Sequence, residues 1–270
     1  MVSNEKRSIK GESSFAYVAK GPRHSIGIDE NGLAYSWGKS NAVGQLGRPT
    51  NAGENLKKSP CRIPIDANGL IVKAYVSHGC DKDTGHSAIL IEDDTSPAGN
   101  GKLPKQELWT VGCDRWQQLG LGSAEGGSTG YTWKGGKLWH ERFTPSVHVT
   151  DLMAKKDPQA RIADVALGGD HTLVLANNGN VYAFGKGGEG QLGLVGKPFV
   201  SAPIKSKALS SPVTKAVCAF RACSIALDEI GETLGKAGSC SSLPLDWLSK
   251  CIQEKEKEGL ISLHAGGVRQ

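Results

Sequence analysis

The stretch GGDHTLVLANNGNVYAFGKGGEGQLG, residues 168–193, decides the fold, because an earlier stretch of the chain repeats its pattern. That earlier stretch is GPRHSIGIDENGLAYSWGKSNAVGQLG, residues 21–47. In each copy a His and a small hydroxyl residue are followed by an Asn-Gly pair, an aromatic residue before Gly, and a final Gln-Leu-Gly. Ordered matches of such a composite pattern identify a repeat protein.

A third copy lies between these two and carries an insertion. It has His86-Ser87 and ends in Gln118-Leu119-Gly120, but residues 92–107 separate its two strands. A degenerate copy spans residues 217–238, where Cys223-Ser224 stands at the position of the His and its hydroxyl neighbour and Gln-Leu-Gly is missing. Residues 260–270 match the first strand of a further copy. The repeats are therefore expected at 15–60, 61–145, 160–205, 212–243 and, in part, 260–270.

Each copy is predicted to fold as a β-hairpin that packs on the next copy. Strand-favouring residues flank the Asn-Gly pairs at 31–32 and 178–179, and these pairs tolerate the positive φ of tight turns. The Gly after the aromatic residue allows close approach of another backbone. We predict that the repeated leucines fill the gap between adjacent units and that the repeated histidines make structural hydrogen bonds. These residues are Leu46, Leu119 and Leu192, and His24, His86 and His171.

The pattern resembles the regulator of chromosome condensation repeat family in its His-Ser/Thr strand, its Asn-Gly turn, its aromatic-Gly pair and its Gly-x-Leu-Gly-type ending. The resemblance implies a β-propeller of about seven blades, in which radial repetition protects the strand edges. The chain is therefore expected to be all-β, a β-propeller or an incomplete propeller arc of about four to five blades of antiparallel strands. Either the propeller has fewer blades, or the arc is open, or the missing blades come from a partner or were lost from this chain. An open arc favours association.

One segment departs from the strand pattern. Residues 244–258, PLDWLSKCIQEKEKE, predict a short C-terminal helix that ends before Gly259. Trp247, Leu248, Cys251 and Ile252 share one face at helical spacing. We expect this face to pack on the last blade, and the alternative is an anchor for a partner helix.

Composition places the chain in a broad class. The net charge of +5 is mild, and no compact run of basic residues predicts direct binding to nucleic acid. Seven cysteines at irregular spacing indicate a reduced, intracellular protein, cytoplasmic or nuclear, rather than a disulfide framework. Residues 1–14 are polar, so they predict a flexible N-terminus and no secretory signal. No stretch predicts a membrane span, and residues 15–270 are expected to form a single repeat domain.

The sequence carries no motif of a hydrolase, transferase or redox enzyme. The Gly-rich residues 185–193 lack the Lys-Ser/Thr ending of a phosphate loop. Residues 78–86, HGCDKDTGH, hold metal-ligating side chains, but their spacing fits no zinc pattern and favours a solvated loop. We therefore expect no catalytic residue, no cofactor and no metal.

The long segment at residues 122–145 is the candidate partner-binding surface. Aromatic residues and Arg dominate the energetics of protein interfaces, and long loops on a rigid scaffold often carry function. The alternative is that its tryptophans fold back to cap the propeller. The candidate residues are Tyr131, Trp133, Lys134, Trp139, His140, Arg142 and Phe143, with Asp114, Arg115 and Trp116 in the neighbouring turn.

The resemblance implies two activities. The first is a protein-interaction scaffold that binds a protein partner through propeller-face loops. The alternative is a guanine-nucleotide exchange factor for a small Ran-like GTPase, which needs no acid, base or nucleophile but binds the nucleotide-free GTPase more tightly than the loaded form. The insertions at residues 92–107 and 122–145 are candidates for the wedge of such a factor. Since the fold alone does not carry either activity, we expect the scaffold first.

Overall fold

The computed structural model describes residues 15–50, 54–56, 60–78, 84–93, 104–121, 131–134, 137–146, 149, 151, 155, 159–244 and 246–262. The polar N-terminus at 1–14, residues 79–83 and most of the partial repeat at 260–270 therefore lie outside the described residues. In the described part of the chain, no helix is both long and apolar enough to cross a bilayer.

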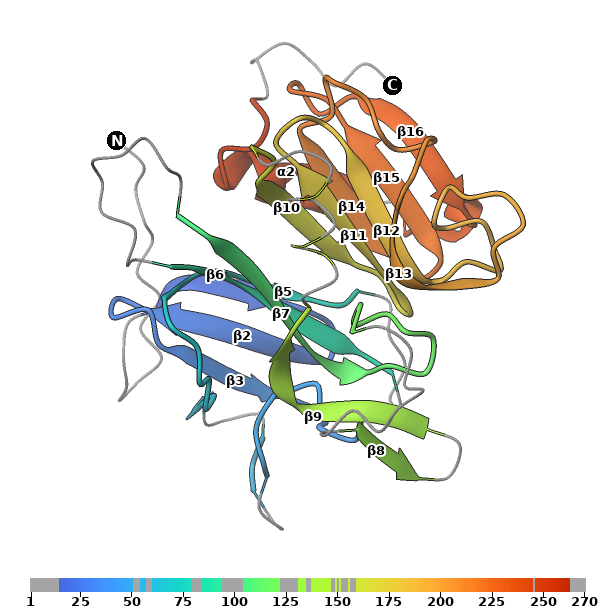
Figure 1. Cartoon of the computed structure of the whole chain (residues 1–270). Helices are drawn as coiled ribbons and strands as arrows, with labels where there is room; N and C mark the ends of the chain where they lie inside the picture. Colours follow the sequence, from blue (N-terminus) through green and yellow to red (C-terminus); the bar gives the residue numbers. More distant parts are fainter. Residues whose placement is uncertain are drawn as a thin grey trace.

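The described strands form four antiparallel sheets, one for each repeat, which we call blades 1 to 4 (Figure 1). Blade 1 contains β1 (Phe15–Lys20), β2 (His24–Asp29), β3 (Ala34–Gly38) and β4 (Cys61–Arg62). Blade 2 contains β5 (Leu70–Val76), β6 (His86–Glu92), β7 (Gln106–Cys113), β9 (Lys137–Pro145) and β8 (Tyr131–Lys134), in that spatial order. Blade 3 contains β10 (Ile162–Leu167), β11 (His171–Ala176), β12 (Val181–Lys186) and β13 (Phe199–Lys205).

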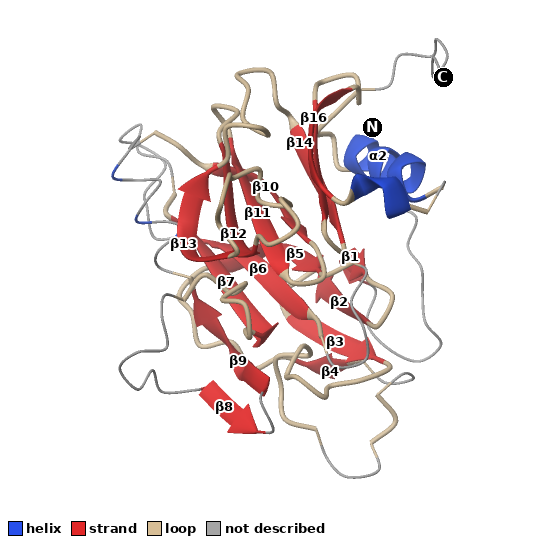
Figure 2. Ribbon diagram, turned by 90° about the vertical axis from the view of Figure 1, so that its right-hand side faces the viewer, coloured by secondary structure: helices blue, strands red, loops and turns tan. Residues whose placement is uncertain are grey.

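Blade 4 has three described strands, β14 (Ala216–Phe220), β15 (Cys223–Leu227) and β16 (Thr233–Gly238). A 3-10 turn, η1 (Cys240–Ser242), leads to the helix α2 (Trp247–Lys257). The blades follow one another as a propeller arc, in which β5 packs against β1 and β2, β10 against β5, and β14 against β10. The first strands of the blades therefore line the inside of the arc, and α2 lies there beside β14 (Figure 2). The expected all-β propeller arrangement with a short C-terminal helix is confirmed.

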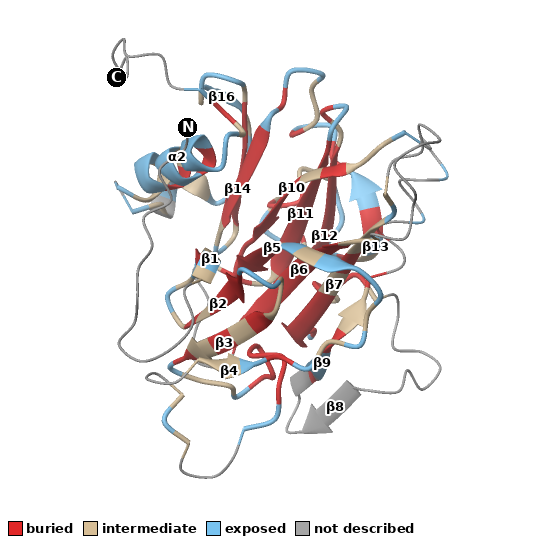
Figure 3. Ribbon diagram, turned by 90° about the vertical axis from the view of Figure 1, so that its left-hand side faces the viewer, coloured by how far each residue is buried: buried red, intermediate tan, exposed pale blue. Residues whose placement is uncertain are grey.

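The apolar core lies between the blades (Figure 3). Successive residues of a strand point to opposite faces, so each blade contributes one set of side chains to each neighbour. In blade 2, Ile89 and Ile91 pack toward blade 1, whereas Ala88 and Leu90 pack toward blade 3. The face of blade 4 that points away from blade 3 is covered by α2 and by Ile261. The core is thus a row of interblade layers rather than one central cluster.

The glycine after the aromatic residue is required by close backbone contact. Gly185 ends the hairpin of blade 3 with φ of +100°, and a Cβ there would lie 2.6 Å from the carbonyl oxygen of Asp170. At Gly38 a Cβ would lie 2.5 Å from the carbonyl oxygen of Arg23. The predicted close approach is confirmed at both positions.

Replacing Leu192 by Ala is expected to lower the free energy of unfolding by about 2–5 kcal/mol. Leu192 is fully buried in the layer between blades 3 and 4, as predicted, and Leu46 and Leu119 are equally buried. The change would be measured by urea titration. Val195→Ala is the control, because Val195 is fully exposed nearby and its truncation should move the midpoint little. A loss at Leu192 no larger than at Val195 would contradict the prediction.

Candidate functional site

Hydrogen bonds from a histidine join each blade to the next. The imidazole Nε2 of His24 in blade 1 lies 2.6 Å from Oγ of Ser87 in blade 2. The Ser87 hydroxyl donates to the main-chain carbonyl of Gln45 in blade 1, at 2.9 Å. One hydroxyl therefore holds both the His-bearing strand and the Gln-Leu-Gly turn of the preceding blade.

The same contact recurs at the two later interfaces. His86 Nε2 lies 2.9 Å from Oγ1 of Thr172, which donates to the Gln118 carbonyl at 2.7 Å. Between blades 3 and 4 the members are His171, Ser224 and Gln191, with distances of 2.8 and 2.7 Å. Because each hydroxyl directs its own proton to a carbonyl, it accepts from the imidazole, which assigns the ring proton to Nε2.

Burial keeps these imidazoles neutral. Loss of solvation lowers the pKa of His24 and of His86 to about 3, and that of His171 to about 4. A neutral ring donates one hydrogen bond from Nε2, which is what the neighbouring hydroxyl requires. The prediction that the repeated histidines are structural hydrogen-bonding groups is confirmed.

The glutamines of Gln-Leu-Gly close their own turns. Their side-chain oxygens accept main-chain N–H groups two residues earlier, at distances of 2.9 to 3.1 Å. The accepting residues are Gln45, Gln118 and Gln191. The amide thus folds the turn while the following leucine enters the core, so the recurring motif is a packing device, as predicted.

Two of the predicted surface aromatics belong to the core. Trp139 in β9 is 9% exposed and packs with Val43 and Cys113, so it seals the junction of blades 1 and 2. Phe143, also in β9, is 6% exposed and packs in the layer between these blades. The alternative that the tryptophans of this segment fold back onto the propeller therefore describes Trp139, and Phe143 is a core residue as well.

The turn that follows β7 has one buried and two accessible members. Asp114 is fully buried, and its carboxylate accepts the main-chain N–H of Leu119 at 2.9 Å, so it holds the turn. Arg115 is exposed and forms an ion pair with Asp170 of blade 3 at 3.2 Å. Trp116 is half-buried, and the Lys186 ammonium of blade 3 lies 5.8 Å from its ring. Arg115 and Trp116 therefore lie at the seam of blades 2 and 3.

The backbone brings the two predicted segments together. Trp139 in β9 pairs in register with Cys113, the last residue of β7, directly before the Asp114–Trp116 turn. Arg142, also in β9, is exposed. The structure describes only the strand backbone at Tyr131, Trp133 and Lys134 of β8 and at His140 of β9. We call Arg115, Trp116 and Arg142 the accessible set.

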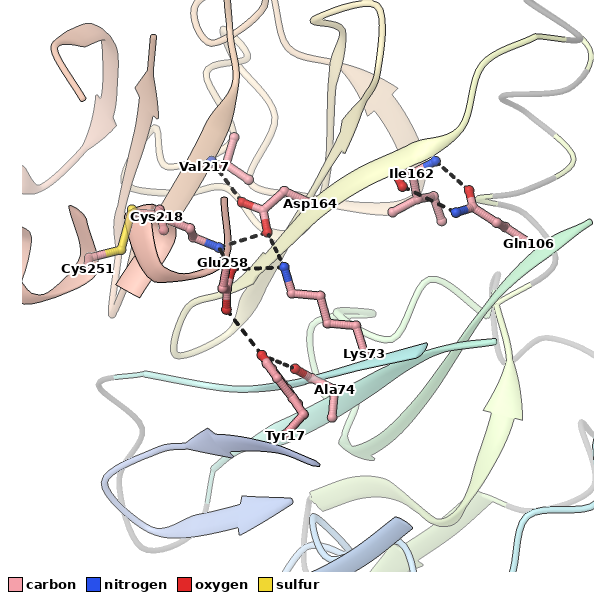
Figure 4. Close-up of polar contacts among 11 residues, drawn as sticks. Tyr17, Lys73, Ala74, Gln106, Ile162, Asp164, Val217, Cys218, Cys251 and Glu258 are labelled. Atoms are coloured by element: carbon pink, nitrogen blue, oxygen red, sulfur yellow. Dashed lines mark hydrogen bonds and ion pairs between the residues drawn. A yellow bond between two sulfur atoms is a disulfide. The ribbon is translucent and has the colours of Figure 1, made fainter. Parts of the chain in front are cut away.

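A charge network with two buried members, Asp164 and Lys255, lies on the inside of the arc (Figure 4). Asp164 of β10 is fully buried, accepts from Lys255 of α2 at 2.7 Å, and takes the main-chain N–H of Val217 on its second oxygen at 3.1 Å. Glu258, directly after α2, binds Lys73 of β5 at 2.8 Å. Asp164, Lys255, Glu258 and Lys73 are the charged members of the network. Together with the main chain of Val217 they join blades 2, 3 and 4 to the helix.

Tyr17 extends this network to blade 1. Its hydroxyl lies 3.2 Å from Glu258 and 3.2 Å from the carbonyl of Ala74. Burial alone would lower the pKa of Lys255, but Asp164 and Glu258 outweigh burial and raise it. The network adjoins an open channel of about 960 Å³ between the first strands and α2. Sequence reasoning missed it, although an Asp within the apolar strand IADVAL was a signal for a buried partner.

The expectation of unpaired cysteines is wrong for four of the seven. Cys218 of β14 is bonded to Cys251 of α2, and Cys223 of β15 to Cys240 of η1. Both disulfides fasten the segment after β16 to blade 4. Their sequence separations of 33 and 17 follow no recurrent spacing, because the pairs form between a repeat and the segment that follows it.

Two family models match the third repeat and its surroundings. Both describe the regulator of chromosome condensation (RCC1) repeat, and they match residues 162–191 and 178–222. The chain carries RCC1 repeats within residues 162–222. Among its curated relatives, Protein RCC2 homolog of Danio rerio is 28% identical over 228 residues, which are 82% of this chain and 41% of that protein.

Other relatives and solved structures agree on the fold. The probable E3 ubiquitin-protein ligase HERC3 of Homo sapiens is 29% identical over 191 residues, which are 69% of this chain and 14% of HERC3. The structure of yeast RCC1 (Prp20) bound to Kap60 superposes with a TM-score of 0.58 at 20% sequence identity. The match covers 84% of this chain and 45% of that chain. Human WBSCR16 has a TM-score of 0.55 at 20% identity, over 82% of this chain and 46% of that protein. This chain thus spans less than half the length of these relatives.

Proposed function

We propose that the chain is a protein-interaction scaffold that binds a protein partner through the loops at the seam of blades 2 and 3. The accessible set supports this proposal, because Arg115 and Trp116 lie in the turn after β7 and Arg142 is exposed on β9, the strand that pairs with β7. Arg and Trp are the residue types that contribute most to protein interfaces. Tyr131, Trp133, Lys134 and His140 extend the proposed surface along the same strand pair.

The frame beneath these loops favours recognition without large rearrangement. The histidine contacts fix each blade to the next, and Asp114 and Gln118 fix the turn that carries Arg115 and Trp116. A surface held in one conformation loses little conformational entropy when a partner binds. We propose that binding itself, rather than chemistry on a substrate, is the activity of this chain.

Replacing Arg115, Trp116 and Arg142 together by Ala is expected to abolish partner binding, since loss of one interface hot spot typically costs ~2 kcal/mol or more. The melting temperature should change little, because none of these three side chains is buried. Partner capture by mass spectrometry and a calorimetric dissociation constant would measure the effect. Trp139 is left intact, since its truncation would disturb the core.

The matched control replaces Lys197, Phe199 and Lys205 by Ala. It removes the same number of cations and one aromatic ring from the exposed outer edge of blade 3. Binding should survive in this control. Unchanged binding in the Arg115/Trp116/Arg142 variant, or equal losses in both variants, would show that the partner site lies elsewhere.

Nucleotide exchange on a small Ran-like GTPase is the second candidate. It is favoured by a relative of Mus musculus titled RCC1-like G exchanging factor-like protein, which is 29% identical over 164 residues. The test is capture with and without depletion of guanine nucleotide. Enrichment of a GTPase only after depletion would favour exchange, whereas a partner captured equally in both conditions favours the scaffold. Under either candidate we propose an intracellular site of action, cytoplasmic or nuclear.

A further inference from the structure

The helix α2 and the residue that follows it, Glu258, contact every blade of the arc, and we call them the clasp. Glu258 lies 3.2 Å from the Tyr17 hydroxyl of blade 1 and 2.8 Å from the Lys73 ammonium of blade 2. Lys255 lies 2.7 Å from Asp164 of blade 3. The attachment to blade 4 includes the disulfide between α2 and β14. One attachment of the clasp can therefore be opened by a reductant.

The helix of the clasp depends on being docked. It has 11 residues, and its N-cap residue, Asp246, makes no side-chain capping hydrogen bond. A helix of this length is marginal in water on its own. Its apolar residues Trp247, Leu248 and Ile252 are only partly buried against blade 4, where Trp247 meets Phe220 at a centroid distance of 5.2 Å. Apolar packing alone therefore gives α2 a weak hold on the blade.

The disulfide of the clasp can be reached from solvent. Cys218 and Cys251 both line the open channel of about 960 Å³ between the first strands and α2. Cys251 is 9% exposed, whereas Cys218 is 1% exposed. Thiol–disulfide exchange requires a thiolate to approach one of the two sulfurs. The channel gives a small dithiol this access, and Cys251 is the sulfur that it reaches first.

We propose that the Cys218–Cys251 disulfide is a redox switch, which holds the clasp on the arc when oxidised and releases it when reduced. With the bond open, the effective concentration of the clasp at its charged partners falls, so α2 undocks and loses its helical structure. Disulfides of cytosolic proteins are usually transient and serve catalysis or redox sensing. In this respect the switch rests on the intracellular site of action proposed above.

The switch opens by exchange with a dithiol reductant. One thiolate of the reductant attacks Sγ of Cys251, the S–S bond breaks, and its electron pair leaves on Cys218, which takes up a proton. The second thiolate of the reductant attacks the mixed disulfide and releases Cys251, which is protonated in turn, and the reductant leaves as a disulfide. The chain gains two electrons and two protons. Exchange with a small disulfide such as oxidised glutathione reverses these steps.

Hydrogen exchange of the full chain, read by mass spectrometry with and without dithiothreitol, tests the switch. Reduction should accelerate exchange of the α2 amides about a hundredfold, whereas the amides of β11 should stay protected. Oxidised glutathione added afterwards should restore the protection of α2. Equal exchange of α2 in both states, a loss of protection that spreads to β11, or no recovery would each overturn the proposal. The measurement needs no partner, so its failure is distinct from failure of the proposed partner site.

Two double variants assign the effect to one disulfide. They are needed because Cys240 is half-buried, so its bond to Cys223 opens under the same reductant. The variant Cys218→Ala, Cys251→Ala should exchange rapidly at α2 with or without dithiothreitol. The matched control Cys223→Ala, Cys240→Ala keeps the disulfide of the clasp and should respond as the wild type does. A response that persists in the first variant, or that is lost in the control, would overturn the assignment.

Discussion

Lowering the pH from 7 to 5 is expected to remove about 6 kcal/mol from the free energy of unfolding through the three interblade histidines, about 2 kcal/mol for each. The fold lowers the pKa of His24 and His86 to about 3 and that of His171 to about 4, mainly through burial. The unfolded chain therefore takes up these protons first. The stability is complete above a pH of about 6.5, the unfolded pKa, and is lost as the pH falls toward the folded values. Urea titrations at successive pH values would measure the loss.

A single substitution separates this effect from the titration of carboxylates. His171→Gln retains an N–H donor that can reach Ser224, but it cannot take up a proton in this range. The slope of stability against pH between 6.5 and 5 should therefore fall by about one proton. His78, whose pKa burial lowers to about 4, contributes in the same direction and is unchanged in this variant. An identical slope in the wild type and in His171→Gln would contradict the assignment.

Replacing Asp164 by Ala is expected to cost about 3–5 kcal/mol of stability, because it leaves a buried ammonium without its closest partner. Lys255 is 8% exposed, and its remaining carboxylate neighbour, Glu258, lies 3.7 Å away. The main-chain N–H of Val217 also loses its acceptor. Urea titration of the single variant would measure this loss.

The double variant Asp164→Ala, Lys255→Met isolates the charge interaction. Removing both charges should recover most of the lost stability, since an apolar side chain of similar length can occupy the buried site without a charged partner. Lys73 and Glu258 still pair with each other in this variant. A double variant that loses as much as the two single variants combined would show that Asp164 and Lys255 act independently.

Repetition explains why much of the fold was predictable from the sequence. Three copies of one pattern identified the hairpins, the buried leucines such as Leu192, and the structural histidines such as His171. Each of these residues serves the same interface in every copy, so its role appears in the sequence as recurrence. The close approach at Gly185 follows from the same regularity, because this glycine lies in each repeat against the carbonyl of the residue that precedes the His.

Features that occur once were not predictable in this way. Asp164 lies in β10 and Lys255 in α2, so no local spacing in the sequence connects the two residues. The disulfide partners Cys218 and Cys251 lie in a strand and a helix of unrelated pattern. Tryptophan is common both in protein interfaces and in apolar cores, so the residue type does not decide the place of Trp139. Its burial depends on Val43 from another blade. The sequence proposed one candidate surface for all of these residues, and only the packing separates Trp139 and Phe143, which are buried, from Arg115, Trp116 and Arg142, which are not.

The position of Glu258 determines when the molecule can be completed during its synthesis. Tyr17 and Glu258 meet although 241 residues separate them, and Lys73 binds the same carboxylate. The ribosome must therefore release the chain through Glu258 before blade 1 can contact the segment that follows α2. Until then Asp164 lacks Lys255, its closest partner, and pairs only with Lys73, whose ammonium lies 3.7 Å away. We expect a chain cut short before α2 to keep this weaker pairing and to be degraded faster than a chain that carries α2.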